Sequence, residues 1–336
     1  MAVRVTSLEA RRRAAARAEH AARPVPKLVE AARPRASKRR EPAVLDQITD
    51  FLSQLADAVN PDVIARLDKE IAERMRRIPT RLNSYGYDPW GFHPDTARRA
   101  LVITALFYRY YFRVETFGIE NLPPGRVLMI GNHAGQVAID AAMIGCATFM
   151  EGHPPRIVRG MGEYWLPTVP FVNELMVRTG SVVGTPKNCV DLLHNEEAVI
   201  AFPEGVRGMN KLFSQRYQLQ EFGLGFVRLA LETKTPIVPV AVVGSEEQAP
   251  AIANLTWLAQ ALNMPAFPIT VTWPWLGPLG LIPLPTKYRV YFGKPMHLDG
   301  DPHDEDRVIK RHVDRVKASI HAMLNRGLRE RRSIFF

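Results

Sequence analysis

The regular part of the chain begins with apolar residues at helical spacing. From residue 44, apolar side chains recur at intervals of three and four, at Leu45, Ile48, Phe51, Leu52, Leu55 and Val59. This spacing predicts an amphipathic helix that ends at Asn60-Pro61, because a residue before proline disfavours helical backbone. A second helix is predicted over 61–77, and a third, aromatic and flanked by arginines, over 95–112 with Asp95 as its cap.

After residue 112 the pattern changes to short apolar runs separated by helical segments. Runs that predict strands lie at 113–117, 127–130, 156–159, 198–202, 237–243 and 288–292. Helical segments follow at 137–150, 168–178, 186–195, 221–233 and 302–330. This alternation predicts an α/β domain over 113–330, with a layered, mostly parallel sheet and flanking helices. A helical region, 43–112, precedes it and is expected to lie near a membrane. The proline-containing run 236–244 suits an edge strand or a strand start, and it is more typical of core than of a site.

The first 42 residues differ in composition from the rest. They hold twelve Lys/Arg against four Asp/Glu, so +8 of the formal charge of +10 lies there and about +2 remains for the body by subtraction. Such a segment has too little apolar surface to offset its ordering entropy, and it predicts a disordered basic tail. A solvated tail is favoured over weak attraction to anionic lipid or nucleic acid, and no specific nucleic-acid partner is expected.

Composition narrows the class of protein further. With 46% hydrophobic and 23% charged residues, a chain of 336 residues is globular. Cys146 and Cys189 lack the spacing of metal ligands and suggest a reducing compartment, and no metal is expected. No stretch reaches the roughly 18 to 20 uninterrupted apolar residues that a spanning helix needs, so a membrane-spanning architecture is not expected.

A histidine and an aspartate stand at the end of a predicted strand. The run 127–130 is followed by Gly-Asn-His-Ala-Gly-Gln-Val-Ala-Ile-Asp, which places His133 in a strand-end loop and Asp140 in the next helix. Open α/β sheets bind ligands at this end of their strands. A carboxylate that fixes one imidazole nitrogen leaves the other as a base that activates a hydroxyl. On spacing alone, a loop histidine with an unrelated helix-surface aspartate is the favoured explanation.

A second strand-end loop carries opposite charges beside a turn. Phe-Pro-Glu-Gly-Val-Arg-Gly at 202–208 follows the apolar run 198–201. Glu204 and Arg207 offer an acceptor for hydroxyls and a cation for an anionic group, beside Gly205 in the turn. The alternative is a surface turn with an ordinary ion pair. In a third segment, 178–188, two glycines lie between Arg178 and Lys187, which suits an anionic ligand but is a weak signal.

In this order the four segments resemble the glycerolipid and lysophospholipid acyltransferase family, of the 1-acylglycerol-3-phosphate acyltransferase type. That family carries Asn-His-x4-Asp, a Gly-x-x-Phe-Ile-x-Arg-like block, Phe-Pro-Glu-Gly-Thr-Arg-Ser and a Val-Pro-Val-like block. Here the third is nearly intact, and the fourth is present as Val-Pro-Val at 238–240. The resemblance covers about 110–295, and the combination is far more specific than any one motif. It favours the functional interpretation of His133 and Glu204.

Two departures from the family pattern bear on substrate choice. Six residues separate His133 from Asp140 instead of four, with Ala138 where the family's Asp falls. We expect Gly135 and Gln136 to lengthen the loop so that the aspartate still reaches the imidazole. This spacing resembles the mono- and diacylglycerol acyltransferase branch. Pro186 stands where the family's Arg aligns, which leaves open whether the acceptor carries a phosphate; Lys187 and Arg178 are the candidate substitutes for that Arg.

Membrane contact is expected from an apolar, uncharged segment near the carboxyl end. Residues 271–285 are rich in Pro and Gly and contain Trp273 and Trp275, a residue type that favours the headgroup level of a bilayer. The prolines exclude a helix, so the segment is predicted to form an apolar loop at the membrane. The alternative is a loop buried on the domain's own core.

Together these features predict a peripheral O-acyltransferase on the cytoplasmic face of a membrane. The resemblance implies transfer of an acyl group from acyl-CoA or acyl-carrier protein, as co-substrate, to a hydroxyl of a lysophospholipid, lysophosphatidate, or mono- or diacylglycerol. His133 would be the base and Asp140 its partner. Glu204, Gly205 and Arg207 would bind substrate, with an oxyanion donor near Gly205 or Gly135.

Other protein classes remain as alternatives. A hydrolase would use the same pair to activate water, although no Gly-x-Ser-x-Gly motif is present. A non-catalytic lipid-binding membrane protein is supported only by the altered spacing. No cofactor is expected, and nothing in the sequence indicates an oligomeric state.

Overall fold

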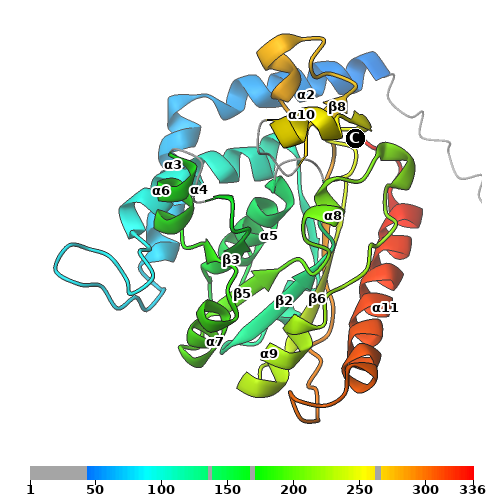
Figure 1. The fold of residues 1–336 in the computed structure, drawn as a ribbon. Coiled ribbons are helices and arrows are strands. Elements are labelled where there is room, and N and C mark those ends of the chain that lie inside the picture. The colour runs from blue at the N-terminus through cyan, green and yellow to red at the C-terminus, as the bar shows by residue number, and fades with distance from the viewer. Residues whose placement is uncertain (1–43, 135–137, 167–170, 262–265) are drawn as a thin grey trace, which may run out of the picture. The chain divides into compact units, whose positions relative to one another are not determined.

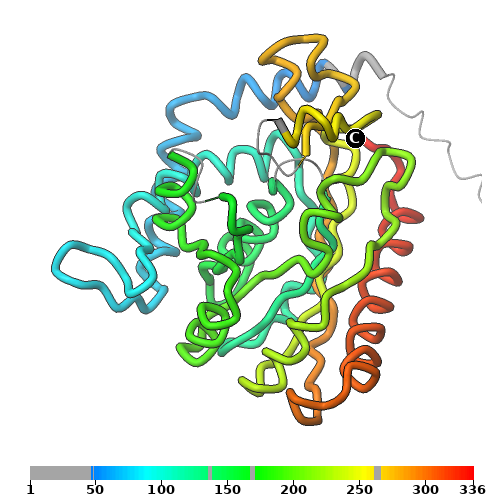
Figure 2. The backbone as a smooth tube through the Cα atoms, in the orientation of Figure 1, coloured from blue at the N-terminus to red at the C-terminus, as the bar shows by residue number. Residues whose placement is uncertain are grey.

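The computed structural model describes residues 44–336 apart from 135–137, 167–170 and 262–265 (Figures 1 and 2). The predicted basic tail, 1–42, lies outside the described residues. Leu45–Phe336 forms one compact unit.

A seven-stranded sheet lies at the centre of this unit. Its order is β1-β9-β6-β2-β5-β3-β4. The bounds are β1 Glu115–Phe117, β2 Val127–Gly131, β3 Val158–Gly162, β4 Val182–Val183, β5 Ala198–Ala201, β6 Ile237–Val243 and β9 Arg289–Phe292. The strands from β6 to β4 run parallel to one another, whereas β9 is antiparallel to β6 and parallel to β1. The prediction of a layered, mostly parallel sheet is confirmed.

Side chains of the central strands alternate between two hydrophobic cores, one on each face of the sheet. Strands β2 and β6 are buried along their whole length. Met129 and Val240 enter a core shared with α3 (Pro61–Met75), α4 (Pro94–Leu106) and α5, whereas Leu128 and Ala241 enter a core shared with α7, α9 and α11. The helix bounds are α5 Ile139–Met150, α7 Pro186–His194, α9 Gly225–Thr233 and α11 Asp306–Glu330. Because helices cover both faces, the strands are near-continuous apolar runs, which made them visible in the sequence.

The N-terminal helical region belongs to the same core as the sheet. It comprises α2 Val44–Ala58, α3 Pro61–Met75, α4 Pro94–Leu106 and the π-helical turn η1 Phe107–Tyr111. Ile71 and Ala105 are fully buried in the core formed with the sheet. Arg98 binds Asp68 at 2.7 Å, and Arg109 binds Glu70 at 2.8 Å, so these arginines join α4 and η1 to α3.

The start and the end of the predicted helix 95–112 require correction. His93, not Asp95, is the cap, because its imidazole accepts the N–H of Thr96 at 3.3 Å and Pro94 occupies the first turn. At the other end the α-helix gives way to the π turn, in which Phe112 N–H donates to the carbonyl oxygen of Phe107 at 2.8 Å.

Two strand expectations also differ from the structure. Strand β3 begins at Val158 and not at 156, because its first pair joins Val158 to Ala198, where β5 begins, and the N–H of Arg156 donates to the carbonyl oxygen of Thr148 at 3.4 Å. Strand β6 is central rather than an edge strand. Its proline is tolerated because Pro239 lies just beyond the last β6–β9 pair, which joins Val240 to Phe292. There the Pro239 carbonyl oxygen accepts the N–H of Gly293, and the β6–β9 ladder needs no N–H from the proline.

The segment between β6 and β9 forms a small substructure that the sequence did not predict. Its elements are β7 Ala251–Asn254, α10 Thr256–Ala261, β8 Pro268–Thr270 and the 3₁₀ turn η5 Gly277–Leu281. Figure 1 shows α10 and β8 above the sheet, at the end where β2 and β6 finish. The remaining short elements are η2 Ile119–Asn121, α6 Val172–Arg178, α8 Val206–Met209 and η4 Phe213–Gln215.

Candidate active site

The loop after β2 is anchored to the neighbouring strand by an asparagine. The Asn132 amide donates to the carbonyl oxygen of Val242 at 3.1 Å, and its oxygen accepts the N–H of Val242 at 2.8 Å. A side-chain amide thus takes the place of a backbone ladder pair, and it fixes the point at which the chain leaves the sheet. His133 follows directly, at the carboxyl end of the parallel strands.

The structure brings His133 and Asp140 together. Imidazole Nδ1 lies 2.9 Å from Oδ2 of Asp140, a residue in the first turn of α5. The same oxygen accepts the N–H of Ala134 at 2.9 Å, and Oδ1 accepts the N–H of Ala141 at 2.8 Å. Three donors therefore hold the carboxylate in one orientation. Gly135 and Gln136, expected to lengthen this loop, lie outside the described residues.

Burial and charge act in opposite directions on the imidazole. His133 is 6% exposed and Asp140 is fully buried. Burial alone would lower the pKa of His133, but the charge and hydrogen bond of Asp140, with smaller contributions from Glu204 and Glu163, raise it overall. With Nδ1–H donated to Asp140, Nε2 is the nitrogen left for a substrate. The ring of Phe202 stacks on the imidazole, with centroids 4.2 Å apart, and limits rotation of the ring.

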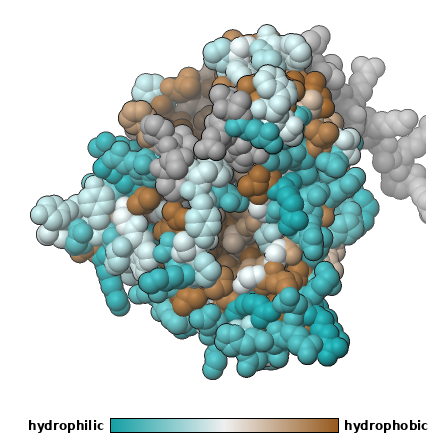
Figure 3. Space-filling view, in the orientation of Figure 1, coloured by the Kyte–Doolittle hydropathy of each residue, from teal (hydrophilic) through white to brown (hydrophobic). Residues whose placement is uncertain are grey.

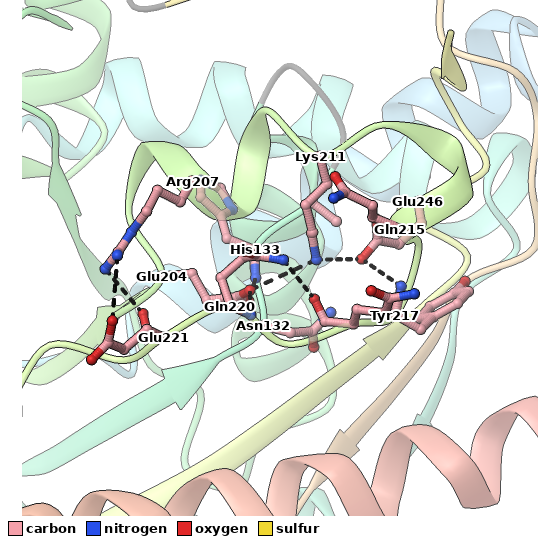
Figure 4. A network of polar contacts seen from close by, with 12 residues as sticks. Asn132, His133, Glu204, Arg207, Lys211, Gln215, Tyr217, Gln220, Glu221 and Glu246 are labelled. Atoms are coloured by element: carbon pink, nitrogen blue, oxygen red, sulfur yellow. Dashed lines mark hydrogen bonds and ion pairs between the residues drawn. The ribbon is translucent and has the colours of Figure 1, made fainter. Parts of the chain in front are cut away.

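Glu204 lies beneath the His133 loop, in a network of polar contacts (Figure 4). One carboxylate oxygen accepts the N–H of His133 at 3.1 Å, and the other accepts the N–H of Gln220 at 2.7 Å. Lys211 Nζ lies 3.7 Å from the second oxygen and 2.7 Å from Glu246. Glu204 is 2% exposed. The sequence predicted that it faces the acceptor, whereas in the structure both of its oxygens bind the protein's own donors and hold the loop.

Two glycines permit this close packing. Gly205 has φ +55° and ψ −148°, a conformation that other residues rarely adopt. A Cβ at Gly208 would lie 2.8 Å from Cβ of Glu204 and 3.0 Å from the carbonyl oxygen of His133. The N–H of Gly205, considered as an oxyanion donor, already donates to the carbonyl oxygen of Phe202 at 2.9 Å.

The predicted cations are less closely associated with the histidine. The Arg207 side chain is 61% exposed and reaches toward Glu221, whose carbonyl oxygen it binds at 3.2 Å (Figure 4). Arg178 pairs with Glu174, and Lys187, 83% exposed, pairs with Asp191. The cavity at His133 is lined by neither Arg178 nor Lys187, so the structure does not bring these two residues to it.

His133 lines a cavity of about 120 Å³ that adjoins a larger apolar one of about 320 Å³. Both are bounded by Ala138, Ala141, Gly160 and Ser181, so they meet at the first turn of α5. The larger cavity continues between α4, α5 and β3, past Leu101, Cys146 and Phe149. The two cavities are thus adjacent, and the larger one presents mainly apolar side chains next to the cavity that His133 lines.

The tryptophan segment is largely exposed. Trp275 is 68% exposed, and Leu276, Leu279, Leu281 and Ile282 are 51–68% exposed, whereas Trp273 is partly buried. In Figure 3 the upper edge, where η5 and α10 lie in Figure 1, alternates hydrophobic and weakly polar surface. The segment thus exposes apolar side chains around the η5 turn, and its contact with a membrane stays a prediction. None of the helices in the described parts of the chain combines the length and apolar character of a membrane span.

Sequence reasoning missed several residues around the histidine. Lys211, Gln220 and Glu163 lie in none of the motifs, whereas Phe202 lies in one but was given no role; Glu163 lines the cavity from the end of β3. Only Phe202 had a usable signal, since it opens the turn that holds Glu204. In the described ranges, no group of three or more His, Cys, Asp or Glu side chains is arranged to hold a metal ion.

Comparison with known proteins identifies the family. Residues 113–243 match the model of the Acyltransferase family. The uncharacterized protein Rv0502 of Mycobacterium tuberculosis is 35% identical over 97% of this chain and 93% of its own length, and the uncharacterized protein ML2427 of Mycobacterium leprae is 35% identical over 97% and 92%. The 1-acyl-sn-glycerophosphate acyltransferase PlsC of Thermotoga maritima aligns with 70% of this chain and 81% of its own, at 17% identity and a TM-score of 0.46. The chain belongs to the acyltransferase family, as its motifs indicated.

Proposed function

We propose that this protein transfers a fatty acyl group from a thioester, acyl-CoA or acyl-carrier protein, to a hydroxyl of a glycerolipid at the cytoplasmic face of a membrane. The observation that carries the proposal is the buried contact between His133 and Asp140 at the wall of an apolar cavity. A base that opens onto water alone would serve hydrolysis equally well. One that opens onto an apolar channel suits a substrate with a long chain.

The reaction needs no acyl-enzyme. Nε2 of His133 removes the proton from the acceptor hydroxyl while the hydroxyl oxygen attacks the thioester carbonyl. The negative charge of Asp140 stabilises the imidazolium that forms. As the tetrahedral intermediate collapses, the C–S bond breaks and the imidazolium returns its proton to the thiolate, so the products are an ester and a free thiol. Arg207, three residues after Glu204 and with a side chain that is 61% exposed, would orient an acceptor headgroup.

The apolar cavities support an acyl substrate. The larger one, about 320 Å³, lies within the range of small-molecule cavities, roughly 300–1,000 Å³. Its lining between α4, α5 and β3 contains no charged side chain. An acyl chain that lies there would hold its carbonyl carbon beside the imidazole, because the two cavities meet next to His133.

Membrane association is supported by the exposed apolar side chains of residues 271–285. Exposed leucines and a tryptophan in a proline-rich loop suit the interface between headgroups and acyl chains, where a tryptophan ring lies with its apolar body buried and its N–H in a polar layer. A peripheral position gives the active site direct access to lipid acceptors.

The test is a comparison of acceptors. Radiolabelled acyl-CoA is offered with lysophosphatidate, with monoacylglycerol and with diacylglycerol, and lipid products are separated. We expect one labelled ester that depends on the added acceptor and is absent with His133→Ala. Thioester loss without an acceptor would instead favour a hydrolase, and lipid binding without turnover a non-catalytic protein. Either result would contradict the proposal.

A further inference from the structure

A second apolar cavity lies on the other side of the first turn of α5. Its volume is about 290 Å³. It is lined by apolar and aromatic side chains that include Ile139, Trp165, Val206, Phe267, Trp273 and Leu281. It shares no lining residue with the two cavities that meet at His133. The proposed reaction assigns no role to this second cavity.

The second cavity is close to the reacting groups through neighbouring residues. Ile139, which lines it, immediately precedes Asp140, and Val206 immediately follows Gly205, which lines the cavity at His133. The dyad therefore stands between two apolar cavities, one reached directly and the other across the first turn of α5.

Most of the lining comes from the segment between β6 and β9. Gln248, Ala249 and the residues at 266–273 and 280–283 line the cavity, and all of them lie outside the family-matched residues 113–243. Most of the cavity wall thus lies beyond the part of the chain that the family model covers, on and around the small β7–β8 sheet and the η5 turn.

The polar groups at its edge already bind the protein. Tyr288 donates to the side-chain oxygen of Gln248, and the Thr270 hydroxyl oxygen accepts the N–H of Trp273 at 2.9 Å. These groups are therefore engaged, and the rest of the surface offers mainly hydrocarbon. Such a cavity gains most from an apolar ligand.

One side of the cavity is thin and faces the exposed apolar loop. Leu281 and Ile282 line the cavity and are also 64% and 51% exposed. A single layer of side chains thus separates the interior from the surface that Trp275 and Leu279 extend. A chain anchored in a bilayer would reach the cavity through this layer without crossing water.

We propose that the second cavity binds the apolar chain of the acceptor, so that the acceptor is a lipid with a tail of its own; the inference rests on the proposed acyl transfer. The acyl chain of the donor and the chain of the acceptor must occupy different places beside the same base, His133. In a thioester the reacting carbonyl is joined directly to its chain, which suits the cavity that includes His133. In a glycerolipid acceptor the glycerol unit separates the reacting hydroxyl from the chain. That separation suits the second cavity, which lies across the first turn of α5 from His133.

The kinetic test varies the acceptor chain while the donor stays fixed. Acceptors with one headgroup and progressively longer alkyl chains are compared, starting from the chainless alcohol. Each methylene buried in the cavity should lower KM by up to about fourfold until the cavity is filled. Ala249→Phe, which fills the cavity, should remove this dependence and leave the dependence on donor chain length unchanged. Met209→Ala, which enlarges the cavity, should extend the dependence of KM on acceptor chain length to longer chains.

A matched control separates filling of the cavity from damage to the small sheet. Ile252→Phe adds the same ring to β7 at a position that is 54% exposed and lines none of these cavities. It should keep the wild-type dependence. Equal KM for chainless and long-chain acceptors would overturn the inference, as would a change in donor selectivity in Ala249→Phe; in both cases the acyl transfer itself would stand.

Direct binding keeps the inference testable even without turnover. In a background with Trp90→Phe, Trp257→Phe and Trp275→Phe, only Trp165 and Trp273 remain of the five tryptophans, and their fluorescence reports on the cavity they line. A monoacyl lipid brominated on its chain should quench this fluorescence, and Ala249→Phe should lose most of the quenching while Ile252→Phe retains it. Equal quenching in the two variants would reject the cavity as the chain site. Loss of all transfer with quenching intact would instead reject the proposed reaction.

Discussion

Two groups of buried charges lie at neighbouring strands of one sheet, and they differ in what surrounds them. The His133 network comprises His133, Asp140, Glu204, Lys211 and Glu246, at the ends of β2, β5 and β6. The Arg159 cluster comprises Arg159 on β3 with Asp88 at 2.6 Å and Glu197 at 2.9 Å. Only the His133 network opens onto one of the cavities described above, the one that His133 lines.

Arg159 and Asp88 of the Arg159 cluster are enclosed by protein, whereas the Glu197 side chain is 25% exposed. Arg159 is 2% exposed and lies 5.6 Å from the ring of Trp90 and 5.2 Å from that of Phe92. Asp88 also accepts the N–H groups of both aromatic residues at 2.8 Å. None of the three charged residues lines the cavities described above. The cluster therefore fastens the loop before α4 to the sheet.

The contrast teaches how a buried charge indicates function. Burial and pairing are common to both groups, so neither distinguishes them. The difference is an ionisable ring with one nitrogen fixed by a carboxylate and a cavity beside it. Substitutions in the two groups should accordingly separate activity from stability.

The largest effect is expected for Asp140→Asn. The amide carries no charge to stabilise the imidazolium and favours the other tautomer, so kcat should fall by about 10²- to 10⁴-fold. Turnover with the preferred acceptor measures this, with circular dichroism as a check of folding. The exposed His297→Ala is the control and should leave kcat unchanged. Wild-type turnover in Asp140→Asn would show that the contact has no chemical role.

Arg159→Met should act on stability instead. It leaves Asp88 and Glu197 without their shared cation, and breaking a buried pair costs about 3–5 kcal/mol. Chemical denaturation should show this loss, while kcat of the folded fraction stays near the wild-type value. The exposed Arg307→Met serves as the control for removal of a charge. A specific fall in kcat at unchanged stability would contradict the assignment.

Lys211→Met should lower stability in a pH-dependent way, because it removes the cation that lies between Glu204 and Glu246. Burial already raises the pKa of Glu246, and Lys211 opposes that rise. Without the lysine the pKa should rise further, so ionisation of the folded protein costs more. The loss of stability in the variant should therefore grow as pH increases from about 4.5 toward neutrality. A loss independent of pH would reject this explanation.

The pH dependence of turnover provides a smaller but specific effect. His133 must be neutral to act as a base, and Asp140 raises its pKa above the ordinary 6.5. The acid limb of kcat/KM should therefore lie above that value, with activity lost as pH falls through it. In Asp140→Asn the limb should move to lower pH, because burial then acts without the opposing charge. An unmoved limb would mean that another group titrates.

The smallest effect is expected at the membrane. Trp275→Ser removes one exposed aromatic ring from the loop and should weaken co-sedimentation with anionic vesicles several-fold without altering stability. Trp90→Phe, far along the chain at the Arg159 cluster, should bind vesicles as the wild type does. Unchanged binding in Trp275→Ser would exclude this loop from membrane contact.

The sequence predicted those parts of the fold that have a local signal. Strand β6 was located at its observed bounds because all seven residues are buried and apolar, whereas the two-residue β4 and the small β7–β8 sheet offer too few positions for a pattern. The proximity of His133 and Asp140 was predictable since only one loop separates them. The contacts of Lys211 and Gln220 depend on how a distant segment returns to the sheet, and no local pattern encodes that.

The most direct test of the central claim is thiol release from acyl-CoA, with and without added lysolipid, in the wild type and in His133→Ala. We expect release that requires both the lysolipid and the imidazole, with one ester formed for each thiol. Release that continues in folded His133→Ala, or that proceeds equally without any acceptor, would contradict this claim.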